Sequence, residues 1–187
     1  MSLHLRRPDA AALARLADLS RSASLTYEPI GISALDTAPR GYHRGHWTCP
    51  LGTGDAAFDA ASDALREWSV HRGAGLIVFA EGPPAVGAIV AMAAPLPVGY
   101  IDVVCRVVEV VDRADRFGFV YGTLPIHPEQ GEETFVVVRT GDDVSFEITA
   151  ISRPRHPLAR VAPPIANLLQ RRATMRYLDS MRAALLH

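Results

Sequence analysis

The sequence contains no lysine, and all nineteen of its basic side chains are arginines. It has only two cysteines, Cys49 and Cys105, and their spacing is not that of a CxxC motif. We therefore expect reduced, buried thiols rather than a redox or metal-binding pair. The longest uncharged stretch, Gly82 to Ile101, is interrupted by four prolines and three glycines, which excludes a membrane-spanning helix. The first residues lack the apolar run of a secretory signal, so we expect a cytoplasmic protein.

The remaining composition is that of an ordinary globular domain. Hydrophobic residues make up 49% of the 187 residues and charged residues 21%, which excludes disorder and coiled coil. The net charge of −1 argues against a nucleic-acid-binding protein, although the stretch from Arg153 to His187 carries seven arginines against one acid. No stacking aromatic pair lies beside these arginines, so we expect no nucleic-acid partner.

Hydrophobic periodicity divides the chain into an N-terminal extension and one larger domain. Residues 1–40 are predicted to form a short helix over 7–19 and a loop rich in serine, proline and glycine. Residues 41–187 are predicted to begin with a strand over 41–49 and a helix that ends at Gly73. The next segments alternate at the period of strands, and a long helix follows at 163–186. The six predicted strands span 76–80, 86–92, 98–112, 117–123, 132–139 and 143–152.

This order of elements predicts an α+β fold of the helix-grip type. A curved antiparallel sheet of about seven strands with one apolar face needs a cover, and the long C-terminal helix can supply it. Such an arrangement often leaves a cavity between sheet and helix.

Short motifs along the chain resemble one known family. They are LTY at 25–27, PRGY at 39–42, WSVHRGAGL at 68–76, YGTLPIHPEQGEE at 121–133, ISRP at 151–154 and LLQRRATMRYL at 168–178. In combination they are similar to the bacterial and plant family known as domain of unknown function nineteen-ninety, from about Leu25 to the C-terminus. This family resembles the START and birch-allergen helix-grip superfamily, whose members bind lipids, sterols and other apolar ligands. The resemblance implies a fold and a cavity, but no particular reaction.

The first functional hypothesis is a binding module for a small apolar or amphipathic molecule. In the strands, the apolar side chains that alternate with glycine or polar residues would line the cavity, and an arginine on the apolar stripe of the last helix would contact an anionic head of the ligand. An ion pair between such an arginine and a carboxylate of the sheet is the structural alternative. The predicted ligand-binding residues are Phe117, Phe119, Tyr121, Glu133, Phe135, Phe146, Ile148, Leu168, Arg171, Arg172 and Met175.

Two further hypotheses remain open. An enzyme of the same fold would use an acid–base cluster from the loop at 121–133, with Tyr121, His127 and Glu133 as the catalytic candidates. A protein-interaction scaffold would use the arginine-rich C-terminal helix as its contact surface. At the predicted end of a helix, Trp68 is interpreted as a packing residue and His71 and Arg72 as compensating the helix dipole, and a cluster of these three residues at the mouth of the cavity is the functional alternative. The sequence contains no nucleotide-binding, zinc or nucleophile motif, so we expect no cofactor and no metal.

Overall fold

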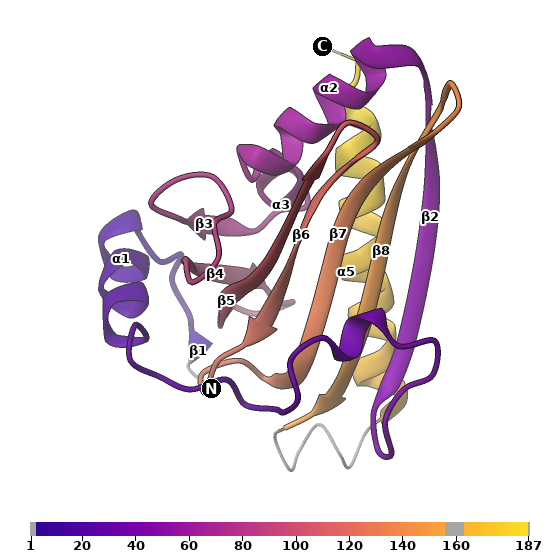
Figure 1. The fold of residues 1–187 in the computed structure, drawn as a ribbon. Coiled ribbons are helices and arrows are strands. Elements are labelled where there is room, and N and C mark those ends of the chain that lie inside the picture. Colours follow the sequence, from indigo (N-terminus) through magenta and orange to yellow (C-terminus); the bar gives the residue numbers. More distant parts are fainter. Residues whose placement is uncertain (1–2, 156–162, 187) are drawn as a thin grey trace.

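The computed structural model describes residues 3–155 and 163–186, with side chains in the second range from residue 172 onward. Its centre is one antiparallel sheet of eight strands in the order β2-β8-β7-β6-β5-β4-β3, with β1 paired to β5 (Figure 1). The strands are β1 Leu3–His4, β2 His43–Thr53, β3 Ile77–Phe79, β4 Ile89–Pro95, β5 Tyr100–Arg113, β6 Arg116–Thr123, β7 Glu129–Thr140 and β8 Asp143–Pro154.

The helices cover both faces of this sheet. The long C-terminal helix α5 (Pro163–Ala184) lies against one face together with α2 (Gly54–Arg66) and α3 (Ser69–Gly73), and α1 (Ala10–Leu19) lies against the other (Figure 1). We call the face under α5 the inner face. The predicted helix-grip architecture is confirmed. Among the described residues, none of the helices is both long and apolar enough to cross a membrane.

Alternation along the strands decides which side chains meet under the helices. In β8, Val144, Phe146 and Ile148 are buried in the main core, whereas Ser145 and Glu147 between them keep part of their surface accessible. Successive side chains of a strand point to opposite faces, so the apolar residues at every second position of β8 all point into the core. The predicted alternation of this strand is therefore confirmed.

The N-terminal segment covers the outer face of the sheet. Leu13 and Ala17 of α1 pack against Ile89 and Ala91 of β4. The residues that alternate with these two in β4, Val90 and Met92, point to the other face and belong to the main core. Further along the segment, Tyr27 lies over Gly122 of β6, where a Cβ atom would collide with the tyrosine ring. The outer face of β6 is thus buried as well, and the glycine at this position permits the close approach.

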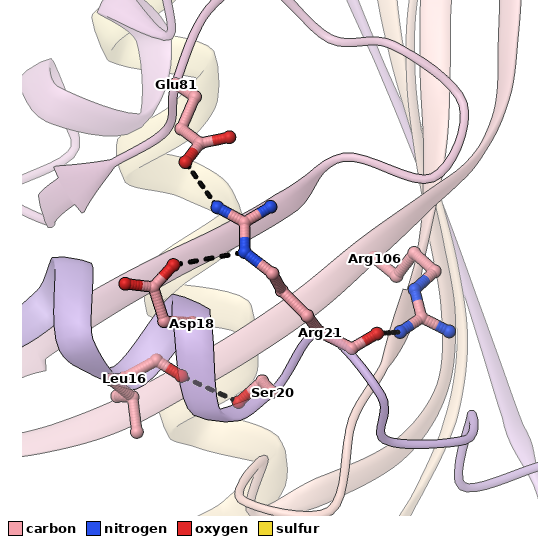
Figure 2. Close-up of polar contacts among 6 residues, drawn as sticks. All are labelled: Leu16, Asp18, Ser20, Arg21, Glu81 and Arg106. Carbon is pink, nitrogen blue, oxygen red and sulfur yellow. Dashed lines mark hydrogen bonds and ion pairs between the residues drawn. The ribbon is translucent and has the colours of Figure 1, made fainter.

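Polar contacts fasten the end of α1 to the sheet (Figure 2). The Arg21 guanidinium donates to Asp18 Oδ1 at 3.0 Å and also forms an ion pair with Glu81, in the loop after β3. The guanidinium of Arg106 on β5 donates to the Arg21 carbonyl at 2.8 Å. Surface ion pairs of this kind stabilise a protein little, and their effect here is to position the segment.

A buried carboxylate ties the following loop to β7. Glu132 is 2% exposed and accepts hydrogen bonds from the Tyr27 hydroxyl at 2.7 Å and from the backbone amides of Gly31 and Ser33 at 2.7 and 2.9 Å. Burial and the neighbouring carboxylate raise the pKa of Tyr27, so its hydroxyl keeps its proton and remains a donor. Three donors compensate the desolvation of the carboxylate, which would otherwise be costly.

We expect the Tyr27→Phe substitution to lower the free energy of unfolding by about 1–2 kcal/mol, because it removes one hydrogen bond to a buried charge. Urea denaturation measures the change. Tyr100→Phe is the matched control, since the Tyr100 hydroxyl has no hydrogen bond to the described residues and its ring is partly buried on the same outer face. An equal loss in both variants would mean that the hydroxyl contributes nothing through Glu132.

The helix predicted to run through to Gly73 is broken at Trp68. This residue has φ 58°, in the left-handed region that side chains other than glycine rarely adopt. The Trp68 ring lies 4.9 Å from that of Phe119, and its indole N–H donates to the Gly82 carbonyl at 2.9 Å. These tertiary contacts offset the backbone strain at Trp68. A second helix, α3, begins at the next residue, and its Val70 and His71 are buried.

Candidate ligand-binding site

Aromatic side chains from three neighbouring strands form a layer on the inner face. The rings of Phe119 and Phe135 lie 5.5 Å apart, and those of Phe135 and Phe146 lie 6.3 Å apart. The layer holds six of the predicted ligand-binding residues, which are all buried: Phe117, Phe119, Tyr121, Phe135, Phe146 and Ile148. They also form the main core, so their burial alone does not distinguish a binding role from packing.

A carboxyl group stands at the edge of this apolar layer. Glu133 of β7 lies directly opposite Tyr121 of β6 in the sheet register, and the Tyr121 hydroxyl donates to Glu133 Oε2 at 2.9 Å. Desolvation raises the pKa of Glu133 to about 7, and the nearby charge of Glu129 adds to the rise, whereas the Tyr121 hydrogen bond opposes it. Two of the three predicted catalytic candidates are thus brought together.

Helix α5 contributes a second tyrosine to the same place. Tyr177 is buried, desolvation and then the Glu133 carboxylate raise its pKa, and its hydroxyl interacts with that of Tyr121. Cys105 of β5 is buried beside the pair, and desolvation raises the pKa of its thiol, with a smaller contribution from the charges of Glu133 and Glu129. A carboxyl, two phenols and a thiol therefore meet beneath α5.

His71 of α3 completes this group, although the sequence favoured a role in compensating the helix dipole over one beside the cavity. The side chain is 0% exposed, and its ring lies 4.7 Å from that of Phe135, 5.1 Å from Tyr177 and 6.0 Å from Tyr121. Neither ring nitrogen has a hydrogen-bond partner among the described residues. Burial lowers the pKa of His71 to about 3, so the imidazole is neutral at physiological pH.

The dipole interpretation of His71 is therefore wrong, whereas Arg72 next to it is exposed and donates to the Glu67 carbonyl. The sequence offers a signal for His71, because it stands in the same short motif as Trp68, and the two rings lie 5.2 Å apart in the structure.

His127, the third predicted catalytic candidate, lies apart from this group. Its Nδ1 accepts a hydrogen bond from the Glu129 backbone amide at 2.9 Å, and burial lowers its pKa to about 4. It is not among the groups that shift the pKa of Glu133. Glu129 instead lies nearer the pair, and its carboxylate accepts from the Ser152 hydroxyl at 2.8 Å. Burial raises the pKa of Glu129, which was not among the predicted site residues.

The sequence predicts an apolar stripe on α5 comprising Ile165, Leu168, Met175, Leu178 and Leu185, and the inward side of the helix agrees with it at Leu178 but not at Met175. Thr174, Tyr177, Leu178 and Met181 are buried, while Met175 is 47% exposed. Of the C-terminal arginines, Arg172, Arg176 and Arg182 are exposed, and Arg182 forms an ion pair with Asp179. Met175 and Arg172 therefore do not face the sheet. The side chains of Leu168 and Arg171 lie outside the described part of the chain.

The described residues contain no group of three histidine, cysteine or carboxylate side chains that could hold a metal ion. The side chains that meet here can form hydrogen bonds and exchange protons: the Glu133 carboxyl can accept or donate, the two phenols donate, and the His71 imidazole can do either.

A curved antiparallel sheet held against a long C-terminal helix defines the class of helix-grip proteins, and solved structures agree. The chain is similar to the hypothetical protein jhp0584 of Helicobacter pylori, with a TM-score of 0.57 over 87% of this chain and 96% of that one, at 11% identity. It is also similar to Ara h 8.0201, with a TM-score of 0.54 over 78% and 99% of the two chains at 13% identity. Human STARD10 matches with a TM-score of 0.50 over 95% of this chain and 81% of STARD10, at 12% identity. At such identities the likeness shows the fold alone.

Within this class the chain belongs to the family described as a domain of unknown function (DUF1990), whose model matches residues 26–180. A UPF0548 protein of Deinococcus radiodurans is 32% identical over 188 residues, covering 92% of this chain and 93% of the relative. A UPF0548 protein of Dictyostelium discoideum is 31% identical over 135 residues, which cover 64% of this chain and 62% of the relative. The family resemblance noted in the sequence is confirmed.

Proposed function

We propose that this protein binds a small apolar or amphipathic molecule between the inner face of the sheet and α5. The observation that carries the proposal is the Tyr121–Glu133 pair, a polar group at the edge of an aromatic layer and beneath the helix. Binding sites for small molecules combine an apolar lining with a few polar groups that fix orientation, and this is such a combination.

The properties of Glu133 support an internal space beside it. Its pKa of about 7 requires strong desolvation, yet its side chain keeps part of its surface accessible. A carboxyl group that faced bulk water would keep an ordinary pKa, and one packed on all sides would have no accessible surface. The combination of the two properties at Glu133 supports a space beside it that is largely enclosed by protein.

The proposed lining follows from this position. It comprises Tyr121 and Glu133, the aromatic layer beside them, and Tyr177 with His71 from the two helices above. Leu168 and Arg171 remain predictions from the sequence. Met175 and Arg172 are left out, because their side chains point away from the sheet.

Binding of the uncharged fluorophore phenylnaphthylamine tests the proposal. Its emission is weak in water and strong in an apolar site, so we expect saturable enhancement on addition of the protein. Ala150 lies opposite Glu133 in the sheet register and is buried. We expect Ala150→Phe to fill the space and weaken binding about tenfold or more, since the added ring takes the place of buried apolar ligand surface.

Glu147→Phe is the matched control, because residue 147 lies on the same strand and the other face of the sheet. It should bind the fluorophore as the unchanged protein does. Absence of enhancement with the unchanged protein, or equal affinity of the Ala150→Phe and unchanged proteins, would contradict the proposal.

An enzyme of the same fold is the second candidate function, and the Tyr121–Glu133 distance of 2.9 Å favours it. A carboxyl group with a pKa of about 7 is suited both to take and to give a proton at neutral pH. In this form of the hypothesis Tyr121 and Glu133 carry the chemistry, and His127 is left out because its Nδ1 accepts from the Glu129 backbone amide and it is not among the groups that shift the pKa of Glu133.

A further inference from the structure

The inner face of the sheet places the carboxyl groups of Glu133 and Glu129 near each other, and no cationic side chain of the described residues pairs with Glu133. Among the described residues, the Tyr121 hydroxyl is the hydrogen-bond partner of Glu133, and the charge of Glu129 lies close enough to act on it. Of the α5 arginines whose side chains the structure describes, Arg172, Arg176 and Arg182 are exposed, so none of these three neutralises the site. Buried charges in proteins are ordinarily paired, because desolvation makes an unpaired charge costly.

A second feature of the same place also lacks a partner. The His71 ring is fully buried beside Tyr121 and Tyr177, the two phenols that surround Glu133, and both of its nitrogens are without a hydrogen bond to the described residues. A buried polar group of this kind is rare in native proteins and is expected to have a partner, which the described residues do not supply.

We propose that the ligand of this site carries a protonated amine, with Glu133 as its counter-ion and the rings of Tyr121 and Tyr177 beside it. This inference rests on the proposed binding function and adds the chemical class of the ligand. An ammonium group would donate to the carboxylate of Glu133 and reduce its repulsion with Glu129. Aromatic rings attract cations through their negative faces, so the two tyrosines favour the same charge.

His71 fits a cationic ligand as well. Because its imidazole is neutral, it adds no positive charge that would repel an amine, and its unprotonated nitrogen can accept a hydrogen bond. An anionic head group would instead face two carboxyls and two phenols in a desolvated place. The anionic ligand expected from the C-terminal arginines therefore has no support from Arg172, which is exposed.

Three ligands with the same decyl chain and different head groups test the proposal: decylamine, decanol and decanoate. Each displaces phenylnaphthylamine in competition at about pH 8, where Glu133 is ionised and the amine is protonated. We expect decylamine to bind about tenfold or more tighter than decanol, because it gains a charge-assisted hydrogen bond, and decanoate to bind more weakly than decanol.

The Glu133→Gln substitution keeps the shape of the side chain and removes the charge. It should make decylamine and decanol bind alike while the affinity for decanol stays the same. Glu109→Gln is the matched control at an exposed position of β5 and should keep the order of the unchanged protein. The order of the three ligands on the unchanged protein decides the matter even if a variant fails to fold.

The outcomes separate the two proposals. If the fluorophore does not bind the unchanged protein, the binding function itself is wrong and the amine inference fails with it. If the fluorophore binds but decanoate competes as well as decylamine, or Glu133→Gln leaves the advantage of decylamine intact, only the inference about the amine is overturned.

Discussion

Replacing His71 with phenylalanine is expected to make the protein more resistant to acid. The pKa of His71 is about 3 in the folded protein against 6.5 for an unperturbed histidine. The unfolded chain therefore takes up a proton below pH 6.5 that the folded protein refuses. His71 therefore leaves the free energy of unfolding at its full value above pH 6.5, and this free energy decreases progressively as the pH falls toward 3. At pH 5 the loss amounts to roughly 2 kcal/mol, which His71→Phe should avoid.

Phenylalanine suits the site because the neighbours of His71 are the rings of Trp68, Phe119, Phe135 and Tyr177. An apolar ring in place of an imidazole without hydrogen bonds is expected to be close to neutral or stabilising above pH 6.5.

Urea denaturation at about pH 7.5 and pH 5 measures the effect, and the quantity of interest is the change in free energy of unfolding between the two. His46→Phe is the control, since His46 is exposed on β2. The difference in free energy of unfolding between the two pH values should be the same in this variant as in the unchanged protein. A pH dependence of His71→Phe equal to that of the unchanged protein would show that the imidazole is not held neutral.

The architecture could be predicted from the sequence because it depends on local periodicity. Alternation in residues 143–152 marks one face of a strand, and the spacing of Phe58, Ala61 and Leu65 marks a helix. Both patterns are written in neighbouring residues, and six strands followed by one long helix leave few ways to cover a sheet.

Properties that depend on distant contacts could not be predicted in this way. The break at Trp68 arises because its indole N–H reaches the carbonyl of Gly82, fourteen residues away. The rotation of α5 was misjudged because the predicted stripe followed leucine and methionine, whereas Thr174 and Tyr177 face the sheet and Met175 does not. A threonine and a tyrosine carry no clear apolar signal, so the sequence pattern included Leu178 but missed these two residues.

The candidate site was predictable only in part for the same reason. Tyr121 and Glu133 were recognised as candidates from their residue types and their strand positions, and the antiparallel register then sets them opposite each other. His127 belongs to the same stretch of sequence, but the turn between β6 and β7 directs its Nδ1 to the Glu129 backbone. The imidazole that does approach the pair is His71, fifty residues earlier in the chain, and tertiary packing alone brings it there.

The Glu133→Gln substitution is expected to stabilise the protein at neutral and alkaline pH. The pKa of Glu133 is raised from 4.5 to about 7, so between these values the folded protein holds a proton that the unfolded chain releases. Stability therefore falls as the pH rises from 4.5 to 7 and stays lower above it, by roughly 3 kcal/mol in total. Glutamine removes this loss and still accepts the hydrogen bond from Tyr121.

Denaturation at about pH 8 should thus show a variant roughly 3 kcal/mol more stable than the unchanged protein, and the two should converge near pH 4.5. The sign is opposite to that of His71→Phe, whose advantage grows toward acid, so each variant controls for a general effect of repacking the cluster. Glu109→Gln at its exposed position should change stability at neither pH.

Equal stability of Glu133→Gln and the unchanged protein at pH 8 would mean that the carboxyl is well solvated and not a desolvated group at an interior site. If Glu133→Gln is instead more stable and no longer prefers decylamine, the ionised carboxylate of Glu133 lowers the stability of the fold and contributes to ligand binding. Functional residues often lower stability in this way.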